Sequence, residues 1–344
     1  MSNFFYIYFI SIIIPFSIQN IISIGYEDNF MRFSDYEMDT NLYENGTEND
    51  YMGDSRLFDS SVFSPSTQIT FNPKIDKYKT KAIFRLKYNE YQSSNQKSYL
   101  NFNFRYEVKL KSYNWIKFSY SLTPKYYLRT FIDRDLLPLT YYPCYFSNEN
   151  VSISYSMPIK LIKKTWWEIK LNLNNQFYNK HFTEFDTKIF GFEGNLKTSH
   201  INSYHFSIGY FYATADNITY GNAQFYESTS IDRSYKKSGI RLNGKKFFKN
   251  NFITSSSLKI KLSKRDYDLN SWYYEYDNWK KYYETEIVLE ANKKINKQLS
   301  LQISAKHFNR DVVSSQSKET LWVEDYKIYS RNELWFKFIY NFKD

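Results

Sequence analysis

The feature that most constrains this chain is an alternation of apolar and polar residues with a period of two. In Tyr99–Lys111, YLNFNFRYEVKLK, every second residue from Leu100 to Leu110 is apolar or aromatic, and the residues between them are polar or charged. Successive side chains of a β-strand point to opposite faces, so the pattern predicts a strand with one apolar and one wet side. The same alternation recurs in twelve segments from residue 79 onward, clearly in 150–157 and 298–305. We therefore expect an all-β fold.

The connections between these segments alternate between short and long. Short links around 112–114, 198–201 and 292–297 alternate with longer ones such as 215–234 and 309–329. Short turns on one rim and long loops on the other are typical of transmembrane β-barrels. The pattern predicts an antiparallel barrel of about twelve strands (fourteen is the alternative), with short periplasmic turns and long extracellular loops. A soluble β-sandwich would show the same alternation around an apolar core, but the loop asymmetry and the number of strands favour the membrane barrel.

The N-terminus is typical of a secretory signal. An apolar run over 4–14 is followed by Pro15, and the small residues Ser23 and Gly25 are placed for cleavage before Tyr26. We interpret residues 1–25 as a signal peptide, with a membrane-anchoring helix as the alternative. Export is the expectation.

Residues 26–60 are acidic, with ten Asp or Glu against Arg32 and Arg56, in a chain whose formal net charge is +10. The division predicted is an irregular N-terminal segment over 26–78, followed by the barrel over 79–344. On this reading the acidic segment lies on the periplasmic side, directly before the first strand. Its carboxylates would either enter a basic lumen as a plug or remain a solvated leader.

The C-terminus resembles the final strand of bacterial outer-membrane β-barrel proteins. In LWFKFIYNF, apolar or aromatic residues occupy every second position: Leu334, Phe336, Phe338, Tyr340 and Phe342. In that family the last residue is typically aromatic, whereas Lys343 and Asp344 follow here. The resemblance implies an outer-membrane location, contact with outer-membrane lipid, and recognition by the barrel assembly machinery.

The polar faces of the predicted strands carry more cations than anions. Rings of Arg and Lys favour anions in pores, so we expect a channel or passive transporter for small, anionic solutes; the alternative is that these charges only hydrate the lumen and pair across strands. The residues expected to line the lumen are Arg85, Arg105, Lys109, Lys117, Arg129, Arg241, Lys259, Lys261, Glu284, Glu286 and Lys306.

Composition argues against several other classes of protein. One cysteine, Cys144, and four scattered His provide no metal-ligand spacing, and the glycine patterns of nucleotide-binding loops are missing. We therefore expect neither a metal nor a cofactor. The basic residues are spread along alternating strand positions rather than gathered in one patch, so a nucleic-acid partner is not expected either. The oligomeric state stays open.

Two further segments suggest alternative functions. The loop 266–279 carries aromatic faces beside carboxylates, which suit sugar rings, so a surface barrel that binds glycans through its long loops is one alternative. The residues concerned are Trp272, Tyr274, Tyr276 and Trp279. The other is an enzyme: His205, Ser207 and Gly209 give the H-x-S-x-G form seen in outer-membrane phospholipases. There the pair faces lipid, whereas the parity here turns His205 and Ser207 inward, so we expect no enzyme.

Overall fold

The computed structural model describes residues 16–43, 50–75, 77–133, 135–136, 140–201, 203–221, 232–249, 252–267, 280–314 and 327–342. Long antiparallel strands make up most of them. The strands are β1 (Phe16–Glu27), β2 (Ser60–Phe71), β3 (Lys74–Ile75), β4 (Tyr78–Tyr91), β5 (Tyr99–Lys111), β6 (Asn114–Asp133), β7 (Thr140–Pro158), β8 (Thr165–Tyr178), β9 (Thr187–Ile201), β10 (Tyr204–Asn217), β11 (Tyr235–Phe247), β12 (Ser255–Tyr267), β13 (Lys280–Lys294), β14 (Leu299–Ser314) and β15 (Tyr329–Phe342). The helices are α1 (Asp35–Tyr43) and the short 3₁₀ turns η1 (Asp50–Met52) and η2 (Thr183–Phe185).

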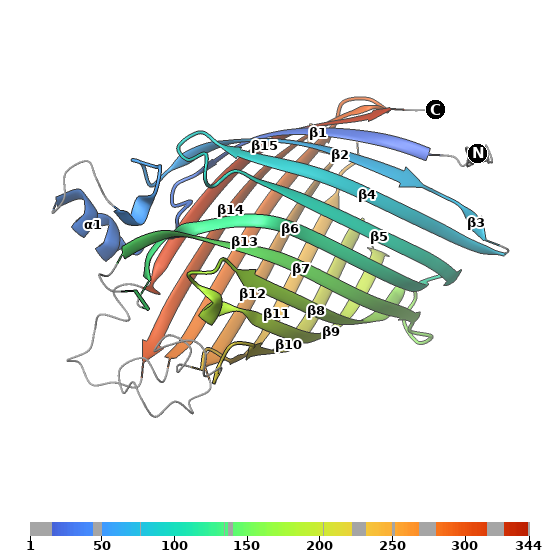
Figure 1. Cartoon of the computed structure of the whole chain (residues 1–344). Coiled ribbons are helices and arrows are strands. Elements are labelled where there is room, and N and C mark those ends of the chain that lie inside the picture. Colours follow the sequence, from blue (N-terminus) through green and yellow to red (C-terminus); the bar gives the residue numbers. More distant parts are fainter. Residues whose placement is uncertain are drawn as a thin grey trace, which may run out of the picture.

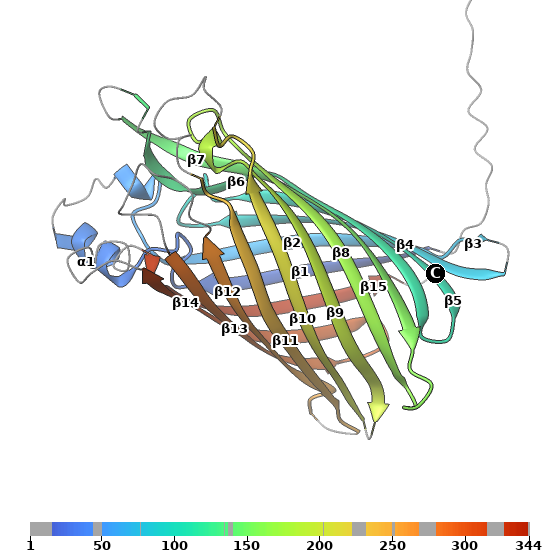
Figure 2. The same ribbon diagram turned by 90° about the horizontal axis from the view of Figure 1, so that it is seen from below.

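The strands close on themselves into a barrel. Each strand from β4 to β15 pairs with the next, β15 pairs with β1, β1 with β2, and β2 with β4. The two-residue β3 only extends one end of β4. The described residues thus form a closed antiparallel barrel of fourteen strands, in which β8–β10 stand on the wall opposite β1, β2 and β15 (Figure 2). The all-β prediction and its fourteen-strand alternative are confirmed, and the preferred number of twelve is wrong.

The first of the two additional strands is β1, most of which lies within the predicted signal peptide 1–25. Its side chains alternate like those of the other strands, with Ile22, Ile24 and Tyr26 exposed and Ser23 and Glu27 buried. It pairs with β15 from Ile18↔Phe342 to Glu27↔Glu333, so cleavage before Tyr26 would remove nearly all of a barrel strand. The apolar residues of β1 continue the apolar run before them, which is why the sequence favoured one leader over 1–25. Residues 1–15 lie outside the described part of the chain.

The second additional strand is β2, which lies within the segment 26–78 that was predicted to be irregular. Pro65 lies in its middle, and Pro cannot donate a hydrogen bond to a neighbouring strand. The pairing of β2 with β4 is interrupted there, between Phe63↔Glu90 and Ser66↔Lys87. The strand is retained because its other neighbour, β1, pairs with it continuously from Phe16↔Phe71 to Glu27↔Ser60.

The two rims differ as expected. Connections of two to seven residues join the strands at one rim, where β3 and the C-terminus lie, whereas the connections at the other rim include 28–59, 218–234, 268–279 and 315–328 (Figure 1). Because β1 precedes it, the acidic segment is the first connection at the long-loop rim, and α1 lies at the end of the barrel away from β3 and the C-terminus (Figure 1). The structure therefore places it at the extracellular end, opposite to the periplasmic position predicted.

The outer wall of the barrel is apolar. Along β10, Phe206, Ile208 and Tyr210 are exposed by 42–52 %, and the residues between them are less exposed. Aliphatic and aromatic side chains continue in the same way on β1, β12 and β15. Such a contiguous exposed apolar surface belongs in lipid rather than in water. None of the described helices has the length and apolarity needed to cross a bilayer.

The extracellular segment 28–59 folds back against the barrel and forms an apolar cluster there. Phe30, Met31 and Phe33 are at most 2 % exposed, and they pack with Val62 of β2 and Tyr91 of β4, among other residues. Burying three large side chains in this way fixes the segment against the wall. The segment consequently shapes the interior of the barrel.

Candidate functional site: a lumen with two chambers

The barrel encloses two cavities that follow one another along its axis. The cavity nearer the extracellular rim, here the outer chamber, has a volume of about 310 Å³. The second, the inner chamber, has a volume of about 730 Å³ and is lined from β1, β4–β8 and β13–β15. Only Arg32 and Gln176 line both chambers among the described residues. The two cavities therefore meet where these side chains lie.

The outer chamber is strongly basic. Its wall carries seven cationic side chains and a single acidic one, Asp232. The cations come from the first extracellular segment, from β6, β12, β13 and β14, and from the long loops. They are Arg32, Arg129, Arg233, Arg265, Lys280, Arg310 and Lys327.

Aromatic rings orient several of these cations. The guanidinium of Arg265 lies 4.6 Å from the ring centre of Tyr235, and that of Arg310 lies 4.9 Å from Tyr282 and 5.0 Å from Tyr329. An aromatic face attracts a guanidinium and restricts its orientation. The outer chamber thus combines fixed positive charge with flat apolar surfaces.

Glu284 of β13 balances part of this charge from within the wall. Its carboxylate accepts a hydrogen bond from Arg310 at 2.7 Å, pairs with Arg265 at 3.5 Å, and is also bonded by Lys237. Glu284 is 7 % exposed, so the bonds with its three partners compensate for its loss of hydration. One carboxylate shared among three cations leaves this part of the wall net positive.

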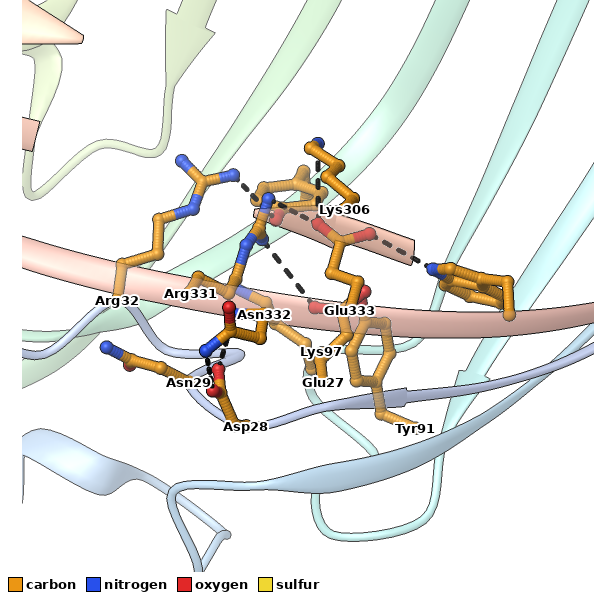
Figure 3. Close-up of polar contacts among 12 residues, drawn as sticks. Glu27, Asp28, Asn29, Arg32, Tyr91, Lys97, Lys306, Arg331, Asn332 and Glu333 are labelled. Carbon is orange, nitrogen blue, oxygen red and sulfur yellow. Dashed lines mark hydrogen bonds and ion pairs between the residues drawn. The ribbon is translucent and has the colours of Figure 1, made fainter. Parts of the chain in front are cut away.

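The inner chamber is closer to neutral. On its wall Arg331 pairs with Glu333 at 2.8 Å and with Glu27 at 3.6 Å, and Glu333 also pairs with Lys306 at 3.3 Å (Figure 3). The cations Arg85, Lys87 and Lys337 line the same cavity. Positive charge still exceeds negative, but by less than in the outer chamber.

The structure places the sequence-predicted lumen residues on inward positions of their strands. Arg85 and Lys306 line the inner chamber, and Arg129 lines the outer one. Most of the others lie in cross-strand ion pairs: Lys117–Glu168 at 3.0 Å, Arg241–Glu193 at 2.5 Å, Lys259–Glu290 at 2.8 Å and Lys306–Glu286 at 3.3 Å. Arg105 pairs instead with Glu107 of its own strand at 3.2 Å. Lys109 and Lys261 lie over the rings of Trp115 and Phe211.

Sequence reasoning missed the cations nearest the extracellular rim. The alternation predicts strands over 250–263 and 298–308. Arg265 and Arg310 follow the same parity as Lys261 and Lys306, but they lie two residues beyond these predicted ends. Extending the alternation by one more pair would have found both. Arg32 carried no such signal, because it is not on a strand.

The structure describes only one of the two sites that the sequence suggested for alternative functions. The aromatic loop of Trp272, Tyr274, Tyr276 and Trp279 lies outside the described residues. His205 and Ser207 alternate on β10 with the exposed Tyr204, Phe206 and Ile208, so they occupy inward positions. This differs from the lipid-facing pair that the resemblance to phospholipases implies.

No protein-family model matches the chain, and no curated protein matches it significantly. Solved structures with a similar fold include a loop-deletion mutant of OmpT, an outer membrane protein of Vibrio cholerae, with 8 % identity, a TM-score of 0.47 and coverage of 95 % of this chain and 99 % of that one. The outer membrane channel DcaP of Acinetobacter baumannii has 10 % identity, a TM-score of 0.44 and coverage of 96 % and 97 %. An anion-selective porin from Comamonas acidovorans has 8 % identity, a TM-score of 0.42 and coverage of 95 % and 99 %.

The architecture of the barrel indicates the class of protein to which the chain belongs. An even number of antiparallel strands closed into a barrel, an apolar outer wall, a polar lumen, and short turns opposite long loops characterise the transmembrane barrels of bacterial outer membranes. A soluble sandwich has neither the closed ring of strands nor the lipid-facing surface. The chain is a transmembrane β-barrel of the outer-membrane type.

Proposed function

We propose that this protein is a passive outer-membrane channel for small anionic solutes. The observation that carries the proposal is the wall of the outer chamber, where seven cations face one acidic residue. A solute arriving from outside meets this chamber first. Fixed cations in a narrow passage with low-dielectric walls raise the local concentration of anions and lower that of cations.

The arrangement of the cations supports passage rather than tight capture. Arg265 and Arg310 share Glu284 and lie over tyrosine rings, so each offers an anion only part of its hydrogen-bonding capacity. A channel needs attraction strong enough for entry but weak enough for release. The remaining predicted lumen cations, such as Lys117 and Arg241, contribute to the same field in weakened form because they are paired.

Planar-bilayer recordings of the refolded protein test this function. Under a salt gradient, the reversal potential of the unmodified protein is expected to show a higher permeability for chloride than for potassium. Arg310→Gln removes one lining charge, so it should reduce this preference. Lys264→Gln is the matched control, because Lys264 alternates with the inward Ser263 and Arg265 and pairs with Asp266 on the outside of the wall.

Cation preference, or no conductance from protein shown to be inserted in the bilayer, would contradict the proposal. An equal loss of anion preference in both variants would also contradict it, because the effect would then come from the overall charge rather than from the chamber.

A further inference from the structure

The junction between the two chambers is formed from opposite walls of the barrel. Arg32 belongs to the segment that follows β1, and Gln176 lies on β8. In the ring of fourteen strands β1 and β8 stand opposite one another. Arg32 and Gln176 are the only described residues that line both chambers, so the two chambers come together beside these side chains.

Local hydrogen bonds fix the backbone that carries Arg32. Arg32 has a φ of +63°, the left-handed region that non-glycine residues rarely adopt. The turn is held by Asn29, whose side chain accepts a hydrogen bond from Phe33 N at 2.8 Å and donates one to Phe33 O at 2.7 Å. The backbone N of Arg32 also donates to Asn29 O at 3.2 Å. These bonds compensate for the strained conformation and direct the Arg32 side chain away from the buried rings beside it.

Contacts with the barrel fix the same segment from both sides. Asn332 of β15 donates two hydrogen bonds to the carboxylate of Asp28, at 2.7 Å from its backbone N and 2.6 Å from its side chain. On the other side, Ser34 and Glu37 form a capping box at the start of α1, and the second oxygen of Glu37 pairs with Arg129 of β6 at 2.8 Å.

The Arg32 side chain points into the lumen. Its Nη2 donates to the hydroxyl of Tyr126 at 3.3 Å, and its guanidinium extends toward the cluster of Glu27, Arg331 and Glu333 (Figure 3). Glu27 and Glu333 are both within the reach of Arg331, which shares them. The charge of Arg32 is thus only partly compensated where the two chambers meet.

We propose that Arg32 is the residue that determines anion selectivity, at a permanent constriction between the two chambers. The inference rests on the proposed channel function and names its critical position. The segment around Arg32 is a fixed part of the wall rather than a movable plug, because withdrawing it would expose Phe30, Met31 and Phe33 and break the bonds of Asp28 and Asn29. Fixed charge has its largest effect where the passage is narrowest and the least water screens it.

Paired neutral substitutions test the position. Arg32→Gln and Lys337→Gln each remove one lumen cation, but Lys337 lines only the inner chamber, which has the larger volume. In reversal-potential measurements Arg32→Gln is expected to lower the ratio of anion to cation permeability by about twofold or more. Lys337→Gln should change it much less. Equal effects of the two substitutions, or no effect of Arg32→Gln, would overturn the inference.

Thiol labelling gives a second readout at the same residue. The single cysteine, Cys144, is fully buried, so an Arg32→Cys substitution in a Cys144→Ser chain offers one reactive site. A cationic methanethiosulfonate should restore anion preference, and an anionic one should reverse it and reduce the current. Modification without a change in current or selectivity would overturn the inference, and so would failure of both reagents to react. Heat-dependent migration on gels checks that each variant is folded.

These results separate the two proposals. If the unmodified protein prefers anions and the Arg32 variants keep that preference, only the constriction is wrong. If the unmodified protein does not prefer anions, the proposed function fails, and the assignment of Arg32 fails with it.

Discussion

Because Gly25 has no side chain, the ring of Trp335 fits against it on the inner wall, where β1 meets β15. The two residues are paired in register, and a Cβ atom added at Gly25 would lie 2.4 Å from Cε3 of Trp335. Trp335 lines the inner chamber, and its indole N donates to Glu333 at 3.0 Å. A residue without a side chain is thus needed at this contact between the first and last strands.

We expect Gly25→Ala to destabilise the barrel by about 1–3 kcal/mol, because the indole or the backbone must shift to admit the methyl group. Gly244→Ala on β11 is the matched control, since a Cβ there would have no heavy atom within 4 Å. Urea unfolding from lipid vesicles measures both. Identical midpoints for the two variants would show that the indole moves aside at no cost.

Glu184 is a buried acid on the short η2 turn, at the extracellular rim. It is 8 % exposed, and this burial raises the pKa of its carboxyl from 4.5 to about 7. Asp133 and Asp135 raise the pKa further, and Arg233 opposes them. Because the folded pKa lies above the unfolded one, the folded protein binds the proton more tightly at this site.

The stability associated with this proton is fully present below pH 4.5 and is lost as the pH rises through about 7. The difference corresponds to a cost on the order of 3 kcal/mol for the charged form at high pH. We expect Glu184→Gln to be more heat-resistant than the unmodified protein at pH 8 and similar to it at pH 4. Thermal unfolding in detergent at the two pH values measures this, and an advantage of the same size at both would exclude titration of Glu184 as the cause.

At the scale of elements, β1 closes the barrel. It supplies the only described link between β15 and β2, through ladders that cover Ile18–Glu27 on one side and Phe16–Glu27 on the other. Without β1, two long strands would expose unpaired backbone groups within the membrane, where each unsatisfied group costs several kcal/mol. We therefore predict that any leader removed from the mature chain ends before Phe16.

Export with a foreign signal peptide tests this element. A chain joined at Phe16 is expected to assemble into a heat-modifiable barrel, whereas a chain joined at Tyr26 should accumulate unfolded or be degraded. Mass spectrometry of the native protein should likewise find an N-terminus at or before Phe16. A folded barrel from the chain joined at Tyr26 would mean that another segment replaces β1.

At the scale of the whole molecule, charge is graded along the lumen. The outer chamber has seven cations against one acid, whereas the inner chamber has six against three, with Arg32 counted in both. On the lipid-facing side of the wall, the alternating positions carry apolar side chains instead of charged ones. One strand pattern thus produces both a surface for lipid and a passage with a positive field.

This field should weaken with salt. The screening length falls from about 10 Å at 0.1 M to about 3 Å at 1 M ionic strength. We expect the permeability ratio of anions to cations, measured at a constant fold-gradient, to fall toward one as the mean salt concentration rises over this range. A ratio independent of salt would point to selection by solute size or by direct binding instead of the field.

The sequence by itself determined which face of each strand meets lipid and which meets water. Leu100 and Phe102 alternate with Asn101 and Asn103 within a few residues, and side-chain direction in a strand depends only on this local parity. The inward positions of Arg85, Lys259 and Lys306, and the difference between the two rims, follow from the same local information.

Only the tertiary structure decided how many strands close the barrel and what divides its lumen. Whether Phe16–Glu27 is a leader or a strand depends on its pairing with β15, more than 300 residues away in the chain. The position of Arg32 likewise depends on the bonds between Asp28 and Asn332, which are 304 residues apart. Contacts of this kind arise only when the ring closes, so no local pattern in the sequence encodes them.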